Sequence, residues 1–269
     1  DTGATASIRL TAVGATAIAI LAGAYAYYHQ QELQVRARTQ AEIDEVSRLK
    51  LTGLVQWRTE RLGDGAVIQQ NPYVIDTVAQ LISGQATVTA TRAFRQWLAA
   101  YRTYQQYDRA LVIKASGEAI MFDDSSATIS PVLIGAAAEA IRANTVTLQD
   151  FYQDRAVGAP RLALVVAVPG PGGRPSQAAL ILRIDPDAFL HPLIEIWQGR
   201  SHSAETELLR RGPTGVQFLN ALRFDAGRAL QPQPTDPNGT AIFARAARGE
   251  TGPIEGADYR GVDAIAFIR

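Results

Sequence analysis

The sequence predicts an α+β protein with one N-terminal transmembrane helix, and three observations support this prediction. Residues 10–28 carry no charged side chain. Residues 29–62 contain no proline and repeat apolar positions at helical spacing. From about residue 110, short apolar runs alternate with glycine-containing turns, which is typical of antiparallel β-structure. We therefore expect a membrane helix, a long stalk helix and then a sheet domain.

The composition is that of a globular protein with balanced charge. The chain has 269 residues, of which 47% are hydrophobic, and its 26 basic and 26 acidic residues sum to a net charge of zero. A neutral balance argues against nucleic acid as a partner. The chain has no cysteine, and its three histidines (His29, His191 and His202) are scattered. We therefore expect no disulfide, no metal site and no cofactor.

The uncharged segment 10–28 has the length of a membrane span. At about 1.5 Å per helical residue it crosses a hydrocarbon core of about 30 Å. Arg9 precedes it, and Tyr25, Tyr27 and Tyr28 end it as an interfacial aromatic belt would. The basic residue in the stub 1–9 favours a cytoplasmic N-terminus. The bulk of the chain would then lie outside the cytoplasm.

Two alternatives remain open for this segment. Ala24-Tyr25-Ala26 has the small-x-small form of a signal-peptide cleavage site, although the apolar run is longer than a typical signal core. Ala15, Ala19 and Gly23 follow one another at intervals of four, which would let a second helix pack closely. Alanine is so common here that the same spacing also arises without specific packing.

The segment 29–62 is predicted to be one long helix. Apolar residues recur at threes and fours from Ile43 to Trp57, with charges between them. This pattern suits a stalk that leaves the membrane, and it also suits an amphipathic core helix. Gly53 is expected to interrupt the helix, and Gly63-Asp64-Gly65 is expected to end it.

The following elements alternate between helical and strand periodicity. Asn71-Pro72 is a helix start, and Ser116-Gly117-Glu118 is a hairpin turn between two apolar runs. Pro169-Gly170-Pro171-Gly172-Gly173 is interpreted as a second hairpin turn, because no helix and no GK[ST] sequence follows, as a phosphate loop requires. The expected helices are 72–82, 90–104 and 132–142, and the expected strands are 110–113, 119–122, 145–151, 162–168 and 178–184.

After residue 184 the order of hairpin, helix and strands is predicted to appear a second time, in a shorter form. We expect a helix over 185–197, a hairpin of strands 205–210 and 216–219, a proline-rich loop over 231–238, a helix over 241–247 and a strand over 262–268.

The second half carries a family resemblance. The stretches Phe189 to Trp197, Ser203 to Arg211, Phe218 to Arg223 and Gly256 to Val262 resemble the membrane-proximal half of a double Cache domain. This is a PAS-like extracellular sensor of bacterial histidine kinases, diguanylate cyclases and chemoreceptors. The resemblance covers residues 29–269. It implies a stalk and membrane-distal Cache-like domain over 29–190 and an incomplete membrane-proximal Cache-like domain over 191–269.

The resemblance also implies a ligand site and raises one discrepancy. Amino-acid-binding members carry arginine, aromatic, tyrosine and aspartate side chains in the distal pocket, and Arg95, Trp97, Tyr152 and Asp154 are of these types. Trp97 can equally be a core residue, and Arg95 and Asp154 can be solvated.

Members of the family usually continue into closing strands, a second membrane helix and a signalling module. This chain stops at Arg269, so it is either cut or an abbreviated relative.

No set of residues predicts catalysis. Ser201-His202-Ser203 are sequence neighbours without a nucleophile elbow, and Asp123-Asp124 are interpreted as a solvated turn.

Two functions remain for the chain. The first is a non-catalytic sensor input module in the bacterial inner membrane, with a periplasmic domain that binds a small organic ligand. The second is a structural subunit of a large membrane complex. In either case the partners are the bilayer and other subunits, or a second copy packed through the transmembrane and stalk helices.

Overall fold

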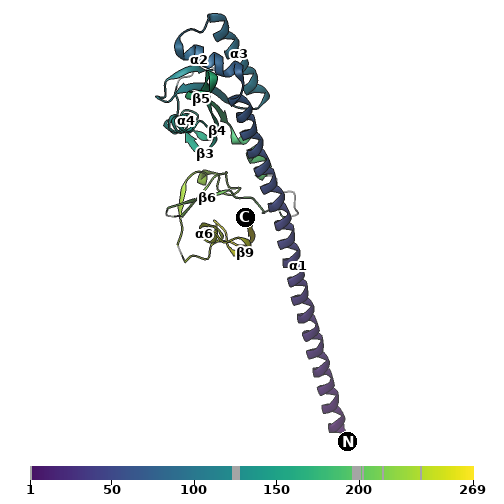
Figure 1. Cartoon of the computed structure of the whole chain (residues 1–269). Coiled ribbons are helices and arrows are strands. Elements are labelled where there is room, and N and C mark those ends of the chain that lie inside the picture. Colours follow the sequence, from purple (N-terminus) through teal and green to yellow (C-terminus); the bar gives the residue numbers. More distant parts are fainter. Residues whose placement is uncertain (1, 123–127, 196–200, 202, 214, 237) are drawn as a thin grey trace. The chain divides into compact units, whose positions relative to one another are not determined.

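The computed structural model describes the chain except residues 1, 123–127, 196–200, 202, 214 and 237, and the side chains of residues 2–15, 17 and 226. The described part divides into two compact units (Figure 1). The first unit comprises Asp1–Arg48 and Pro237–Arg269, and the second comprises Leu49–Asp236. The expected division into Cache-like domains at residues 190 and 191 stays a prediction.

Helix α1 (Thr2–Gln69) is continuous through the glycines that were expected to interrupt and end it. The predicted end at residues 63–65 is therefore wrong. A Cβ atom at Gly65 would lie 2.4 Å from Val146 Cγ1 and 3.3 Å from Val166 Cγ2. Gly65 thus lets the helix approach the sheet closely. Packing on that sheet outweighs the cost of a helical glycine, about 1 kcal/mol.

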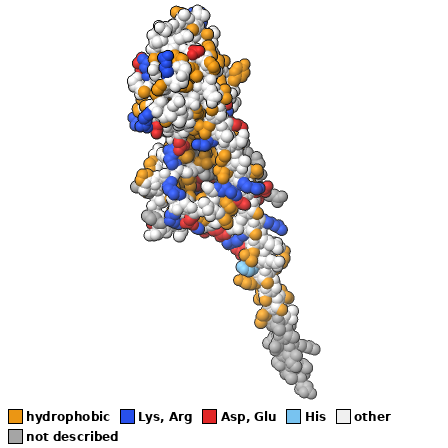
Figure 2. All heavy atoms as spheres, viewed as in Figure 1, with side chains coloured by type: hydrophobic (Ala, Val, Ile, Leu, Met, Phe, Trp, Pro, Cys, Tyr) orange, Lys and Arg blue, Asp and Glu red, His pale blue; other side chains and the backbone are white. Residues whose placement is uncertain are grey.

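The N-terminal part of α1 is only partly described. Within the residues whose side chains the structure describes, no helix has a stretch long and apolar enough to cross a membrane. The side chain of Ala15 lies outside the described part, as do those of residues 10–14. Ala19 is exposed, and no atom lies within 4 Å of a Cβ built on Gly23. In Figure 2, the coloured part of α1 before His29 carries hydrophobic and uncharged side chains.

The second unit is built on a five-stranded antiparallel sheet with the order β2-β1-β5-β4-β3. Its strands are β1 (Arg109–Lys114), β2 (Ala119–Phe122), β3 (Val146–Asp154), β4 (Ala159–Gly170) and β5 (Arg174–Ile184). All five expected strands are confirmed. The turn between β4 and β5 contains a short 3-10 helix, Pro171–Gly173, and Gly172 and Gly173 have φ of 71° and 77°. The structure confirms the predicted hairpin turn. Glycine occupies these two positions because it adopts such positive φ angles readily.

Helices cover both faces of this sheet. Helix α2 (Pro72–Ser83) and helix α3 (Val88–Tyr104) pack with the end of α1 on one face, around Val74, Phe94 and Leu98. Helix α4 (Pro131–Ala143) packs on the other face, around Leu133 and Ala137. The Asn71 side chain accepts a hydrogen bond from the Tyr73 amide and so caps α2, as predicted.

The rest of the chain forms short elements. The expected helix over 185–197 is divided into a 3-10 turn, Pro186–Ala188, and α5 (Leu190–Glu195), because Phe189 adopts non-helical angles; residues 196–197 lie outside the described part. A three-stranded sheet in the order β6-β7-β8 follows, with β6 (Leu209–Gly212), β7 (Gly215–Phe218) and β8 (Pro232–Pro234). A short 3-10 turn, Ala226–Arg228, precedes β8.

The predicted strand over 205–210 is wrong for residues 205–208, which precede β6. The Asn220 side chain accepts a hydrogen bond from the Leu208 amide at 2.7 Å and donates one to the Thr206 carbonyl at 3.0 Å. An asparagine side chain therefore replaces a neighbouring strand here.

In the first unit, α6 (Ile242–Ala247) precedes a two-stranded sheet of β9 (Gly252–Ala257) and β10 (Asp263–Ile268). Arg36 of α1 forms an ion pair with Glu255 of β9 at 2.9 Å, and Arg269 pairs with Asp44. The helix and the terminal strand predicted in this region are confirmed.

Candidate functional site

Charged side chains gather at one end of the central sheet, in what we call the arginine–aspartate cluster. Its members are Arg109, Arg161, Arg183, Asp108, Asp154 and Asp185. Side chains alternate between the faces of a strand. Arg109 and Arg183 are partners in the β1–β5 register and follow the same alternation as Leu111, Ile113 and Ile181, which pack against α4. The cluster therefore lies at the edge of the α4 face.

Ion pairs join most of the cluster. Arg183 donates through Nε to Asp108 Oδ1 and through Nη1 to Asp154 Oδ2, both at 2.9 Å. Arg161 pairs through Nε with Asp108 Oδ2 at 2.9 Å and through Nη2 with Asp185 Oδ2 at 3.1 Å. Asp108 thus bridges two guanidinium groups. Burial lowers the pKa of Arg183, but the hydrogen bonds and charges of the two aspartates outweigh it and raise that pKa.

The third arginine has a different environment. Arg109 is 5% exposed, and its Nη1 donates to the Thr128 carbonyl at 3.2 Å. Its guanidinium lies over the Phe122 ring, 5.6 Å from the centroid. Arg109 is therefore held between the end of β2 and the residues that precede α4.

The Tyr152 hydroxyl is a buried polar group of this region without a hydrogen-bond partner in the described structure. The residue is 6% exposed, and its buried hydroxyl makes no hydrogen bond within the described part of the chain. Burial raises the pKa of this phenol, the charge of Asp154 raises it further, and Arg183 lowers it. The group therefore stays neutral, and its unused O–H donor is what an acceptor on a ligand would satisfy.

A bulge in β3 places Tyr152 and Asp154 on this face. The register with β4 shifts between Gln149 and Tyr152, so that Tyr152 stands opposite Arg161. Phe151 then packs with the core on the other face. Two of the four site residues suggested by the resemblance are therefore close neighbours.

The other two lie elsewhere. Trp97 is in α3 and packs in the core on the opposite face, where its ring centroid is 5.7 Å from Phe94 and 5.4 Å from Tyr101. Arg95 is exposed on the same helix. The structure thus does not bring the four residues into one cluster.

Sequence reasoning missed the arginines of the cluster. A signal was present, because Arg109 and Arg183 lie at the ends of apolar strands, in phase with residues of one face. No group of histidine, aspartate and glutamate side chains in the described part of the chain is arranged to hold a metal ion. Asp123-Asp124 and His202 lie outside the described residues.

The comparisons with known proteins concern the fold. The sequence matches no protein-family model and no curated protein. Among solved structures, the ligand-binding domain of the Pseudomonas fluorescens chemoreceptor CtaA, in complex with L-serine, superposes with a TM-score of 0.52 at 14% identity, over 86% of this chain and 89% of that domain. The chain has a Cache sensor-domain fold.

Other solved structures of the same class are also similar. The Pseudomonas aeruginosa amino acid chemoreceptor PctC, in complex with GABA, gives a TM-score of 0.49 at 14% identity, over 72% of this chain and 80% of that domain. A Campylobacter jejuni chemoreceptor domain with 4-methylisoleucine gives 0.46 at 13% identity over 58% of this chain. The chain spans 62% of that Campylobacter domain, less than two thirds of its length. The superposition on the Pseudomonas fluorescens domain confirms the resemblance seen in the sequence, for the Cache fold alone.

Proposed function

We propose that this chain is the non-catalytic input domain of a bacterial membrane sensor, and that it binds a small carboxylate or amino acid at the arginine–aspartate cluster. The observation that carries the proposal is the buried Tyr152 hydroxyl, which has no hydrogen-bond partner in the described structure and lies in the field of Asp154 and Arg183. The receptor domains of similar fold were solved with L-serine, GABA and 4-methylisoleucine.

The chemistry of the cluster suits such a ligand. A ligand carboxylate can accept hydrogen bonds from Tyr152 and from the guanidinium groups of Arg109, Arg161 or Arg183. A ligand ammonium group can pair with Asp154. A ligand that carries both charges leaves the balance of three arginines and three aspartates unchanged, so its burial costs less than that of a lone ion.

We further propose that residues 10–28 anchor the chain in the inner membrane, with the N-terminus cytoplasmic and the sheet domain periplasmic. Support comes from the uncharged run itself and from the exposure of Ile18, Ile20, Leu21 and Tyr25, which are 66–72% exposed. Ligand binding would have to favour one of two arrangements of α1 to send a signal across the membrane. Ala15, Ala19 and Gly23 are proposed as the helix-packing surface for a second copy or another subunit.

The test is isothermal titration of the full chain in detergent with the common L-amino acids and C4 dicarboxylates. At least one should bind, and Tyr152→Phe should weaken that binding about tenfold, since it removes one buried hydrogen bond and keeps the ring. The exposed Tyr104→Phe, at a side chain 86% exposed, is the matched control. Unchanged affinity in Tyr152→Phe, or no binding by the whole panel, would contradict the proposal.

A second function, a structural subunit of a membrane complex, is favoured by a different observation. Four ion pairs already satisfy much of the cluster from within, and aliphatic side chains fill the adjoining α4 face. A domain that only packs against neighbours needs no ligand. Stoichiometric co-purification with other membrane proteins, together with a failed ligand panel, would establish this alternative.

A further inference from the structure

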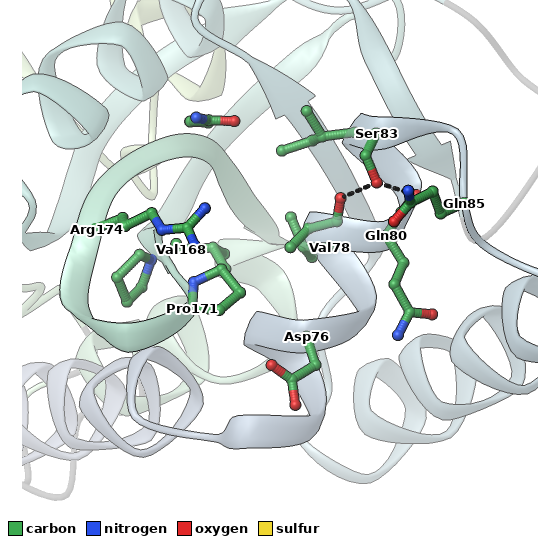
Figure 3. Close-up of a pocket in the computed structure, with 13 residues that line it drawn as sticks. Asp76, Val78, Gln80, Ser83, Gln85, Val168, Pro171 and Arg174 are labelled. Atoms are coloured by element: carbon green, nitrogen blue, oxygen red, sulfur yellow. Dashed lines mark hydrogen bonds between the residues drawn. The ribbon is translucent and has the colours of Figure 1, made fainter.

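A hollow of about 400 Å³ lies on the second unit, between α2 and the turn that joins β4 to β5 (Figure 3). Its lining includes Asp76, Val78 and Gln80 of α2 and, from the hairpin, Val168, Arg174 and Gln177. Val78 and Val168 belong to the core on the α2–α3 face, whereas the arginine–aspartate cluster adjoins the α4 face. The hollow is therefore separate from the site described above.

The floor of the hollow is apolar and firmly held. Val78 and Val168 are each 2% exposed and pack in the main core, so neither can turn away without opening a cavity. Because β4 and β5 are central strands of the sheet, the floor has a fixed position. A molecule bound here would cover apolar surface that already has a defined shape.

The walls carry opposite charges that do not neutralise each other. Asp76 belongs to α2 and Arg174 begins β5, and no hydrogen bond or ion pair within the described chain engages either side-chain charge. Figure 3 shows the Arg174 side chain reaching from the turn toward α2, and Asp76 carried by α2. Free charges on both sides of an apolar floor complement a molecule that has an ammonium group, a carboxylate and apolar atoms between them.

The amide side chains restrict the ligand further. Gln80 and Gln177 line the hollow from opposite elements, and neither side chain is hydrogen-bonded within the described residues. A primary amide offers one acceptor and two donors, which match the N–H and C=O of a peptide group. The volume falls in the range typical of small-molecule sites, about 300–1,000 Å³.

We propose that this hollow binds short zwitterionic peptides, of two or three residues with small aliphatic side chains. Arg174 holds the C-terminal carboxylate, Asp76 holds the N-terminal ammonium group, and the glutamines bond the peptide groups. The bound peptide joins α2 to the β4–β5 turn. This is a second site, and it does not depend on ligand binding at the arginine–aspartate cluster.

The experiment uses the full chain and the dipeptide L-alanyl-L-valine as probe. Calorimetry should show binding, and both N-acetyl-alanyl-valine and alanyl-valinamide should bind at least about tenfold more weakly, because each lacks one charged terminus. Asp76→Asn and Arg174→Gln should each lower the affinity for the parent dipeptide by a similar factor. Both residues are exposed, so the variants should fold normally.

The control removes an equivalent pair of charges elsewhere. Glu139→Gln and Arg142→Gln alter exposed residues of α4 and should leave dipeptide binding unchanged. Hydrogen exchange then locates the site, because the dipeptide should slow exchange over residues 76–85 and 168–177. Protection confined to residues 150–155 and 181–185, equal affinity for the blocked peptides, or no dipeptide binding would overturn this proposal. Tyr152→Phe should leave dipeptide binding unchanged. Failure of the peptide-site proposal is therefore distinguishable from failure of the proposed function.

Discussion

Arg183 donates to Asp108 and to Asp154 from two different nitrogens, with both N–O distances at 2.9 Å. The two carboxylates come from residues far apart in sequence, one preceding β1 and the other at the end of β3. A single guanidinium therefore ties the central strand β5 to the start of β1 and to the edge strand β3.

Removal of Asp108 should be strongly destabilising. Asp108→Ala leaves two guanidinium groups, each 9% exposed at the side chain, without their shared carboxylate, and we expect a loss of about 3 kcal/mol. Urea unfolding, monitored by tryptophan fluorescence, measures this loss in the free energy of unfolding. Glu139→Ala is the control, because it breaks an exposed pair worth less than about 1 kcal/mol. Equal effects of the two variants would contradict this interpretation of the cluster.

Tyr152→Phe should separate stability from binding. The hydroxyl is buried without a partner, so its removal should leave the free energy of unfolding unchanged or raise it by up to about 1 kcal/mol. Ligand affinity should fall, as argued above. Thermal unfolding with and without ligand measures both quantities. A destabilised variant would mean that the hydroxyl has a partner in solution, which would remove the basis for a ligand contact.

Lys50 should make stability depend on alkaline pH. The residue is 8% exposed, and its Nζ donates to the Ile194 carbonyl and to Thr206 Oγ1. Burial lowers the pKa of Lys50 from 10.5 to about 8, and Glu195 opposes the shift. Between these two values the unfolded chain binds more protons than the folded one, so stability rises with pH across that window.

The measurement is urea unfolding of the wild type and of Lys50→Met from pH 7 to 10. The wild type should gain stability relative to the variant above pH 8. Lys114→Met, at the chain's other lysine, controls for the loss of a positive charge. Parallel pH curves for the wild type and Lys50→Met would show that Lys50 is not desolvated.

Two glycines of α1 should respond oppositely to alanine. Gly65→Ala places a methyl group 2.4 Å from Val146 Cγ1 and should destabilise the chain by about 1–3 kcal/mol. Gly63→Ala meets no atom within 4 Å and should stabilise it by up to about 1 kcal/mol. Thermal unfolding measures both. Val146→Ala should restore part of the loss in Gly65→Ala, and a lack of such coupling would exclude the proposed steric cause.

Local chemistry explains which elements were predictable. The five strands, the cap at Asn71 and the turn at Gly172 and Gly173 follow from apolar periodicity and from residues with special backbone preferences. The end of α1 was not predictable in this way. Gly63 and Gly65 signal a helix end locally, and only the sheet that packs on Gly65 explains why the helix continues.

By itself, the sequence determined the class of fold, the succession of strands and the long N-terminal helix, because these depend on the spacing of apolar residues along the chain. The tertiary structure decided which charged residues meet. Arg109, Arg161, Arg183 and Asp154 come together only through the strand order and the bulge in β3. Trp97, of a suitable type for the same site, lies on the opposite face because α3 packs there. A binding site depends on distances between strands, and those distances are set by packing.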